Sequence, residues 1–410
     1  MSSKIDSREA WLVTVAALAM ASVCFGAPLV VTVALKYVAA DLGGYRSIPS
    51  AALSLGMFGT GIGGLAMGWL ADRFGVRSVV MFGASMVCMG LMLSAGGQAW
   101  QLYVGHGLFI GLLGNGAIHA PLYVYVTRWF EARRGTALAL IASGQYIAGA
   151  TWPPVFERVT AAYGWQTCMA GFGILVVVVV LPLAVLFLRA APEQPDSKPG
   201  ATAAAGGGTV LDLRPNTAFA LLAIASFLCC VPMAMPASHL IAFCGDVGLT
   251  AAKGAAMLSV LLVTAFVSRQ LWGWLSDRVG GLMTLLVGSL AQVSGMTGFL
   301  LTQDEAGLFA VAAVFGLGLS GLVPAYILSI RQLFPAREAS WRIPALLLTA
   351  MAGMATGSWS AGFIYDRAGY YAPAFATGIA ANLLHLCIIT TLVLQWRRMP
   401  DRPALGRAVA

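Results

Sequence analysis

Long apolar runs, separated by short polar turns, fill almost the whole of this chain. The runs do not alternate apolar with polar residues as membrane strands do, and each is close to the ~20 residues that a helix needs to cross a bilayer. We therefore expect an all-α membrane protein, because in lipid a helix satisfies its own backbone hydrogen bonds. The pattern predicts twelve transmembrane helices, at residues 11–37, 49–71, 78–97, 101–127, 135–157, 166–189, 216–240, 252–275, 282–302, 307–330, 342–365 and 371–396.

One phrase occurs twice in the polar turns. Residues 68–75 read GWLADRFG and residues 273–280 read GWLSDRVG, so that six of the eight positions are identical. A second pair, FEARR at 130–134 and FPARE at 334–338, recurs at almost the same distance, which is half of the 410-residue chain. Repeats in the same order and direction indicate two parallel-related bundles of six helices.

A stretch rich in Pro, Gly and Ala separates the two halves and is typical of a mobile connector. We expect an N-terminal six-helix bundle at residues 1–190, a cytoplasmic linker at 191–215 and a C-terminal six-helix bundle at 216–410.

The composition indicates that lipid is the main solvent of the chain. Hydrophobic residues make up 59% and charged residues only 10%, whereas a soluble domain carries roughly 25% charged residues. The net charge of +8 does not indicate a nucleic-acid partner, because the basic residues lie in short turns between apolar runs.

Other functional classes lack their sequence signatures. The chain has no GxxxxGK[ST] loop, which argues against an ATP-driven pump. Nothing in it resembles a Ser/His/Asp triad or a metal-ligand cluster, and the seven cysteines show no CxxC spacing. We therefore predict no enzymatic activity, no cofactor and no metal, and we expect a monomer whose partners are the bilayer and a small substrate.

The distribution of Lys and Arg predicts the orientation in the membrane. Five of these residues fall on one side, Arg269 lies inside a span, and all the rest of the 24 fall on the side of the termini, the linker and both repeated phrases. We expect that basic side to be the cytoplasm and the membrane to be the cell (inner) membrane. The five on the other side are Lys36, Arg46, Arg158, Lys253 and Arg367.

The phrase at residues 68–75, followed by Val76 and Arg77, resembles the signature between the second and third helices of major facilitator superfamily transporters, and residues 273–280 resemble its weaker copy. The resemblance covers essentially the whole chain. It implies the major facilitator fold, in which two six-helix bundles rock about a central substrate cavity that opens to one side at a time.

A finer resemblance lies in RWFEARRGTA at residues 128–137, in the pairs Ser143-Gly144 and Gly164-Trp165, and in SRQLWGWLSDR at residues 268–278. These segments are similar to the oxalate/formate antiporter and monocarboxylate transporter branch. That branch keeps an arginine in the eighth helix shortly before the second signature, which implies that the substrate is a small organic anion.

Arg269 is the only Lys or Arg well inside a predicted span. It lies roughly 12 Å along the helix from the turn at Asp277, at 1.5 Å per residue. A buried arginine is costly and usually faces a cavity, and its planar guanidinium matches a carboxylate with two parallel hydrogen bonds. We predict that Arg269 binds the substrate; the alternatives are a structural ion pair or a side chain that reaches the interface.

Five further polar residues inside spans are substrate-binding candidates. Proline lies near three of them, and the related transporters often place a histidine or a tyrosine at such positions. Each could instead pack or form a hydrogen bond between helices. The five are His239, His119, Tyr326, Asn115 and Gln145.

The sequence leaves the coupling ion open. Related proton carriers have an acidic or polar residue four positions before the arginine of the eighth helix, where this chain has Ala265. A proton could instead bind His239 or His119, because histidine titrates near neutral pH. The alternative is exchange of one anion for another without protons.

The repeated turns predict a gate. Charged side chains at neighbouring helix ends can form bridges in one conformation and break them in the other, which shifts the equilibrium between conformations. The same charges also hold the turns in the cytoplasm. The set comprises Gly68, Asp72, Arg73, Gly75, Arg77, Arg133, Arg134, Asp277 and Arg278.

We therefore expect a secondary transporter that carries a monocarboxylate such as lactate or pyruvate with a proton. The alternatives are an anion exchanger of the oxalate/formate type, a facilitator of sugars or drugs in which Arg269 is structural, and a membrane sensor that binds without transport.

Overall fold

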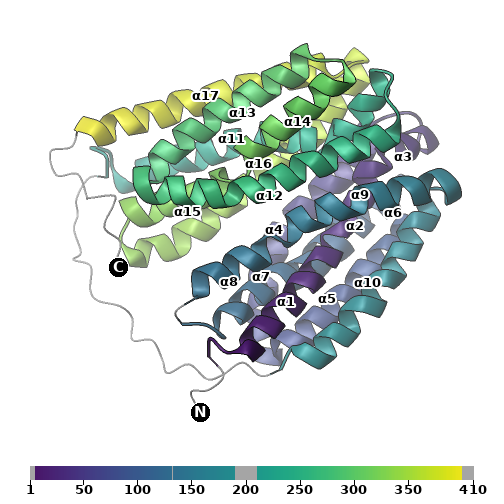
Figure 1. The fold of residues 1–410 in the computed structure, drawn as a ribbon, viewed down its shortest axis with the longest axis horizontal. Coiled ribbons are helices and arrows are strands. Elements are labelled where there is room, and N and C mark those ends of the chain that lie inside the picture. The colour runs from purple at the N-terminus through teal and green to yellow at the C-terminus, as the bar shows by residue number, and fades with distance from the viewer. Residues whose placement is uncertain (1–4, 132, 190–209, 399–410) are drawn as a thin grey trace. The chain divides into compact units, whose positions relative to one another are not determined.

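The computed structural model describes residues 5–131, 133–189 and 210–398, except for the side chains of residues 134, 135, 270, 277, 336, 337 and 340. These residues are almost entirely helical, which confirms the all-α prediction (Figure 1). Within them no β-strand forms, and a single isolated bridge joins Val210 and Leu213. Most of the predicted linker lies outside the described residues.

The chain divides into two compact units: Met1–Gly200 with Thr250–Ser259, and Ala201–Leu249 with Val260–Ala410. Unit 1 contains α1 (Arg8–Cys24), α2 (Gly26–Val33), α3 (Leu35–Asp41), α4 (Ser47–Phe74), α5 (Val76–Ser94), α6 (Ala99–Val104), the π-helix η2 (Gly105–Asn115), α7 (Gly116–Thr127), α8 (Arg134–Ala142), α9 (Gly144–Tyr163) and α10 (Trp165–Phe187). Helix α12 (Ala251–Val279) begins in unit 1 and continues in unit 2. The other helices of unit 2 are α11 (Pro215–Asp246), α13 (Gly281–Leu301), α14 (Glu305–Leu319), α15 (Leu322–Leu333), α16 (Ala336–Ala368) and α17 (Ala372–Arg398).

Each of the twelve predicted spans coincides with helix, but not all of them meet a strict test for crossing a membrane. Ten helical segments in the described residues are long and apolar enough to do so. The other two predicted spans are 135–157, which a break at Ser143 divides into α8 and α9, and 342–365, which lies inside α16. The count of twelve therefore stays a prediction.

Besides the span 135–157, three predicted spans are divided where their helices bend or change pitch. The first breaks at Phe25 and Ala34, the fourth contains the π-helix η2, and the tenth breaks at Ser320 and Gly321. The seventh stays one helix, α11, through both of its prolines.

Glycines let α4 pack directly against η2. A Cβ atom on Gly59 would lie against the carbonyl of Gly107, and one on Gly63 would meet the carbonyl of Leu112. Only glycine permits this approach of two backbones, which is a common device in membrane helix pairs.

The two halves share the geometry of one turn. Gly75 and Gly280, which end the two copies of the repeated phrase, have φ of +83° and +82°. Gly164 and Gly369 also share φ, at +83° and +82°, but their ψ values of 160° and −3° differ, so these two turns are not alike. These conformations favour glycine, because a Cβ atom is strained at positive φ. The phrase that is repeated in the sequence thus ends, in both halves, in the same backbone turn.

Candidate functional site

Arg269 lies on α12, next to the residues that dock this helix within unit 2. The hydroxyl of the buried Ser268 is 2.8 Å from that of Ser320, and Trp272 Nε1 donates to the carbonyl oxygen of Leu317 at 2.6 Å. Ser268 and Trp272 are four positions apart and therefore share a face. Arg269 lies about 100° around the helix from Ser268, since 3.6 residues make one turn. Its side chain is half-buried.

Tyr326 lies in α15, which begins just after the break at Ser320 and Gly321. Its side chain is 1% exposed, and its hydroxyl has no hydrogen-bond partner among the described residues. A buried hydroxyl without a partner is costly, so such a group is a candidate for contact with a ligand.

His239 is fully buried, and both nitrogens of its ring have partners. Nε2 is 2.9 Å from the carbonyl oxygen of Ser358, and Nδ1 is 2.9 Å from the hydroxyl of Tyr371. A carbonyl only accepts, so Nε2 carries a hydrogen, and in the neutral ring the tyrosine donates to Nδ1. His239 thus ties α11 to α16 and to the start of α17, and it must exchange one of these partners to contact a substrate.

Unit 1 holds a pair of buried polar residues. Asn115 and His119 are four positions apart at the junction of η2 and α7, and their side chains are 4% and 8% exposed. The His119 ring stacks on Phe25 with centroids 3.6 Å apart, at the break between α1 and α2. Asn115 Oδ1 and His119 Nε2 have no hydrogen-bond partner within the part of the chain that the structure describes.

Gln145, the remaining substrate-binding candidate, is exposed in the first turn of α9. The buried polar group at this junction is instead Ser143, whose hydroxyl donates to the carbonyl of Ala139 at 2.7 Å.

The repeated phrases carry the same pair of side chains. The Arg73 guanidinium lies 5.7 Å from the ring centroid of Trp69, and Arg278 lies 4.0 Å from that of Trp274. Asp72 accepts from Arg128 at 2.7 Å, which joins the end of α4 to the end of α7. The sequence did not reveal Arg128 as the partner of Asp72, because the two residues lie 56 positions apart along the chain.

The other gating candidates lie at the same turns. Gly68 is half-buried, whereas Gly75, Arg77 and Arg133 are exposed. The side chains of Arg134 and Asp277 lie outside the described residues.

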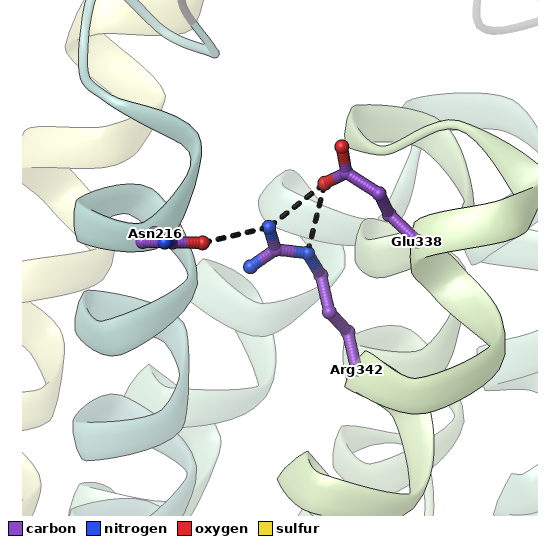
Figure 2. Close-up of polar contacts among 3 residues, drawn as sticks. All are labelled: Asn216, Glu338 and Arg342. Carbon is purple, nitrogen blue, oxygen red and sulfur yellow. Dashed lines mark hydrogen bonds and ion pairs between the residues drawn. The ribbon is translucent and has the colours of Figure 1, made fainter.

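Helix α16 contains a buried arginine, Arg342, which the sequence placed at the start of a predicted span, on the basic side of the membrane. Figure 2 shows the Arg342 guanidinium between the carboxylate of Glu338, at 2.8 and 3.1 Å, and the amide oxygen of Asn216, at 3.0 Å. Its side chain is only 3% exposed. The rings of Phe219, Phe334 and Trp341 surround it, with centroids 5.0, 4.4 and 4.6 Å away.

The i,i+4 spacing of Glu338 and Arg342 between aromatic residues was the available signal for this pair. It was missed because α16 begins at Ala336, six residues before the predicted start of the span.

Comparisons with known proteins agree on one family. The family model described as Major Facilitator Superfamily matches residues 10–303. The MFS-type transporter pynF of Aspergillus niger is 26% identical over 81% of this chain and 76% of its own length. Monocarboxylate transporter 13 of Bos taurus is 24% identical over 84% of this chain and 79% of its own length.

A solved structure, that of the peptide transporter POT in complex with sulfate, has the same fold. It covers 95% of both chains with a TM-score of 0.70 and 15% sequence identity. At that identity the likeness concerns the arrangement of helices alone.

Proposed function

The chain belongs to the Major Facilitator Superfamily and is therefore a membrane transporter rather than an enzyme, and from that premise we propose that it carries a small monocarboxylate by alternating access. Lactate and pyruvate are the expected substrates, each moving with a proton. The observation that carries the proposal is Arg269, a half-buried guanidinium inside a span of unit 2.

The chemistry of the guanidinium favours this substrate class. A carboxylate that enters the protein loses its hydration, and a planar fork of N–H donors replaces it with two charge-assisted hydrogen bonds. The similarity to monocarboxylate transporter 13 supports the same class.

Polar groups in both units are the proposed additional contacts. Tyr326 in unit 2 and Asn115 and His119 in unit 1 have buried polar atoms that lack a partner among the described residues. His239 and Gln145 are the remaining proposed contacts with the substrate. His119 and His239 are the residues that the sequence suggests as carriers of the coupled proton.

We place the protein in the cell membrane with both termini in the cytoplasm. The distribution of Lys and Arg supports this orientation. The bridge between Asp72 and Arg128 and the two Trp–Arg pairs then lie at the cytoplasmic ends of their helices, where they form the proposed gate.

Uptake of labelled lactate, pyruvate, formate and oxalate into proteoliposomes tests the proposal. We expect an inward proton gradient to drive accumulation of a monoacid above its equilibrium level. If none of the four acids enters faster than into protein-free vesicles, the proposed substrate class is wrong.

One residue favours a second candidate function, anion exchange. Ala265 is fully buried and apolar at the position where related proton carriers have an acidic or polar group. An exchanger would take up labelled acid only into vesicles preloaded with a second anion, and a proton gradient would add nothing.

A further inference from the structure

A chain of buried polar side chains runs through unit 2, away from the candidate residues described so far except Tyr326. It joins α11, α13 and α17, which pack against one another (Figure 1). All five side chains have no exposed surface; they are Cys229, Ser289, Gln292, Asn382 and His385.

The direction of every hydrogen bond in this chain is fixed from one end. The backbone carbonyl of Cys229 can only accept, so Gln292 donates its amide to it at 3.0 Å. The amide oxygen of Gln292 therefore accepts from the amide of Asn382. The oxygen of Asn382 in turn accepts from the hydroxyl of Ser289 at 3.0 Å.

This order determines the tautomer of His385. The Ser289 hydroxyl has used its hydrogen on Asn382, so its oxygen accepts from His385 Nδ1, 2.9 Å away. Nδ1 thus carries the hydrogen of the neutral ring, and Nε2 presents a bare lone pair. Nε2 is buried and has no partner among the described residues.

The ring of Tyr326 is a neighbour of the His385 ring. The two rings are 6.1 Å apart between centroids, and the buried Tyr326 hydroxyl also lacks a partner within the described chain. A hydroxyl can donate to a bare nitrogen and can accept from a protonated one, so it suits both states of the ring.

The surroundings of His385 contain few other groups that titrate. Helix α15 contributes Tyr326, and α11 contributes Cys229 and its neighbour Cys230, all of them buried. Ser289 and Gln292 of α13 do not titrate. Helix α16 carries no Asp, Glu, Lys, Arg or His between residues 343 and 365.

We propose that His385 binds the proton that travels with the substrate, accepting it at Nε2. The proton comes from water on one side of the membrane and returns to water on the other, and no covalent bond to carbon changes. In the charged ring both nitrogens donate, Nδ1 to Ser289 and Nε2 to the oxygen of Tyr326.

This site rests on the proposed function, because the proton matters to transport only if an anion accompanies it. A proton on His385 adds a positive charge to the interior of unit 2, and an anion beside Arg269 adds a negative charge to the same unit. Each therefore favours binding of the other, and the effect is reciprocal.

The other membrane histidines are bound differently. The Nε2 hydrogen of His239 is held by the carbonyl oxygen of Ser358, and the ring of His119 is stacked on Phe25. His106 resembles His385 most closely, with Nδ1 3.1 Å from the Ser94 hydroxyl and 3.2 Å from the Leu102 carbonyl, but it lies in unit 1. It is the matched control.

Nitrogen-15 spectroscopy of histidine-labelled protein tests the site without any transport assay, because the chain has only four histidines. Comparison with the His385→Gln variant identifies the His385 signals. We expect the Nδ1–H tautomer at about pH 8, and a doubly protonated ring when pyruvate is added at about pH 5. An Nε2–H tautomer, or a ring that stays neutral at both pH values with pyruvate bound, overturns the proposal.

Transport by His385→Gln in proteoliposomes gives the second test, because the glutamine amide stays polar but takes no proton. We expect proton-driven accumulation to fall about tenfold or more, while exchange of labelled for unlabelled substrate falls much less. His106→Gln should retain proton-driven accumulation.

The outcomes separate the two proposals. Undiminished proton-driven accumulation in His385→Gln, or an equal loss in His106→Gln, overturns the assignment of His385. Failure of the unmodified protein to transport any of the four acids instead overturns the proposed function, and the spectroscopic result on His385 stands by itself.

Discussion

At the scale of single residues, the proposed function depends on the shape of one side chain as well as on its charge. Arg269→Lys keeps the positive charge and removes the planar fork of donors. We expect the apparent affinity for the carboxylate to fall roughly 10- to 100-fold, as the loss of a charge-assisted hydrogen bond implies. Concentration-dependent uptake measures it.

Arg331, which is exposed in the last turn of α15, offers the matched control for this substitution. Arg331→Lys should leave the affinity unchanged. Equal affinities for Arg269→Lys and the unmodified protein would mean that Arg269 does not hold the carboxylate by its fork.

The hydroxyl of Tyr371 stabilises the buried ring of His239. Tyr371→Phe removes the donor to Nδ1 and leaves that nitrogen buried, which costs about 1–3 kcal/mol. We expect a clearly lower melting temperature in detergent. Tyr163→Phe is the control, because Tyr163 is 72% exposed. If the two variants melt alike, the Tyr371 hydrogen bond contributes nothing to stability.

Single residues differ in how far the sequence revealed them. Arg269 was visible as the lone charge in an apolar run, and Tyr326, Asn115 and His119 were visible as polar residues in spans. The hydrogen-bond partners of His239 could not be predicted from the sequence, because Ser358 and Tyr371 lie more than a hundred residues away along the chain. The cluster around Gln292 was hidden for the same reason, since Asn382 is on another helix.

At the scale of helices, the packing of α4 on η2 depends on the absence of side chains. Gly63→Ala would place a Cβ atom against the carbonyl oxygen of Leu112 and push the two helices apart. We expect a lower melting temperature and a lower yield of folded protein. Size-exclusion chromatography of a fluorescent fusion gives both quantities.

Gly171 in α10 is a matched control for this helix contact. A Cβ atom there meets nothing within 4 Å, and alanine raises helix propensity by roughly 1 kcal/mol. Gly171→Ala should therefore be neutral or stabilising. A Gly63→Ala protein as stable as Gly171→Ala would contradict the close approach of α4 and η2.

Arg342 joins the start of α11 to the start of α16 (Figure 2). Glu338→Gln removes the negative charge beside a guanidinium that is only 3% exposed. Because the Glu338 side chain is itself 40% exposed and Asn216 still accepts from Arg342, we expect a cost of about 1–3 kcal/mol. The double variant Glu338→Leu with Arg342→Met removes both charges and should recover much of that loss. The melting temperatures of the unmodified protein, Glu338→Gln and the double variant in detergent test this prediction. A double variant less stable than Glu338→Gln would show that the uncompensated charge is not the cause of the loss.

Helix positions were largely predictable, and helix interruptions were not. The apolar runs gave the positions because length and hydrophobicity are local properties. The π-helix η2 and the breaks at Phe25 and Ser320 occur where helices pack against neighbours, which local sequence does not encode. Conversely, α11 continues as one helix through Pro232 and Pro236, although proline lacks the backbone donor that a helix interior uses.

At the scale of the whole molecule, the orientation in the membrane is open to a simple test. The distribution of Lys and Arg predicts a cytoplasmic C-terminus. A green fluorescent protein fused after Ala410 should fluoresce, and alkaline phosphatase fused there should be inactive. Active phosphatase would reverse the predicted orientation and place the Asp72–Arg128 bridge on the opposite side.

The paired turns at Gly75 and Gly280 bear on how the protein is made. Apart from the ten residues 250–259, unit 1 is complete by residue 200. The first half can therefore reach its helix packing while the ribosome is still synthesising the second, which then repeats the same turn. Co-expression of the two halves as separate polypeptides should accordingly restore a working protein. A single break in the connecting segment leaves intact the sequence that determines the helix packing of each half.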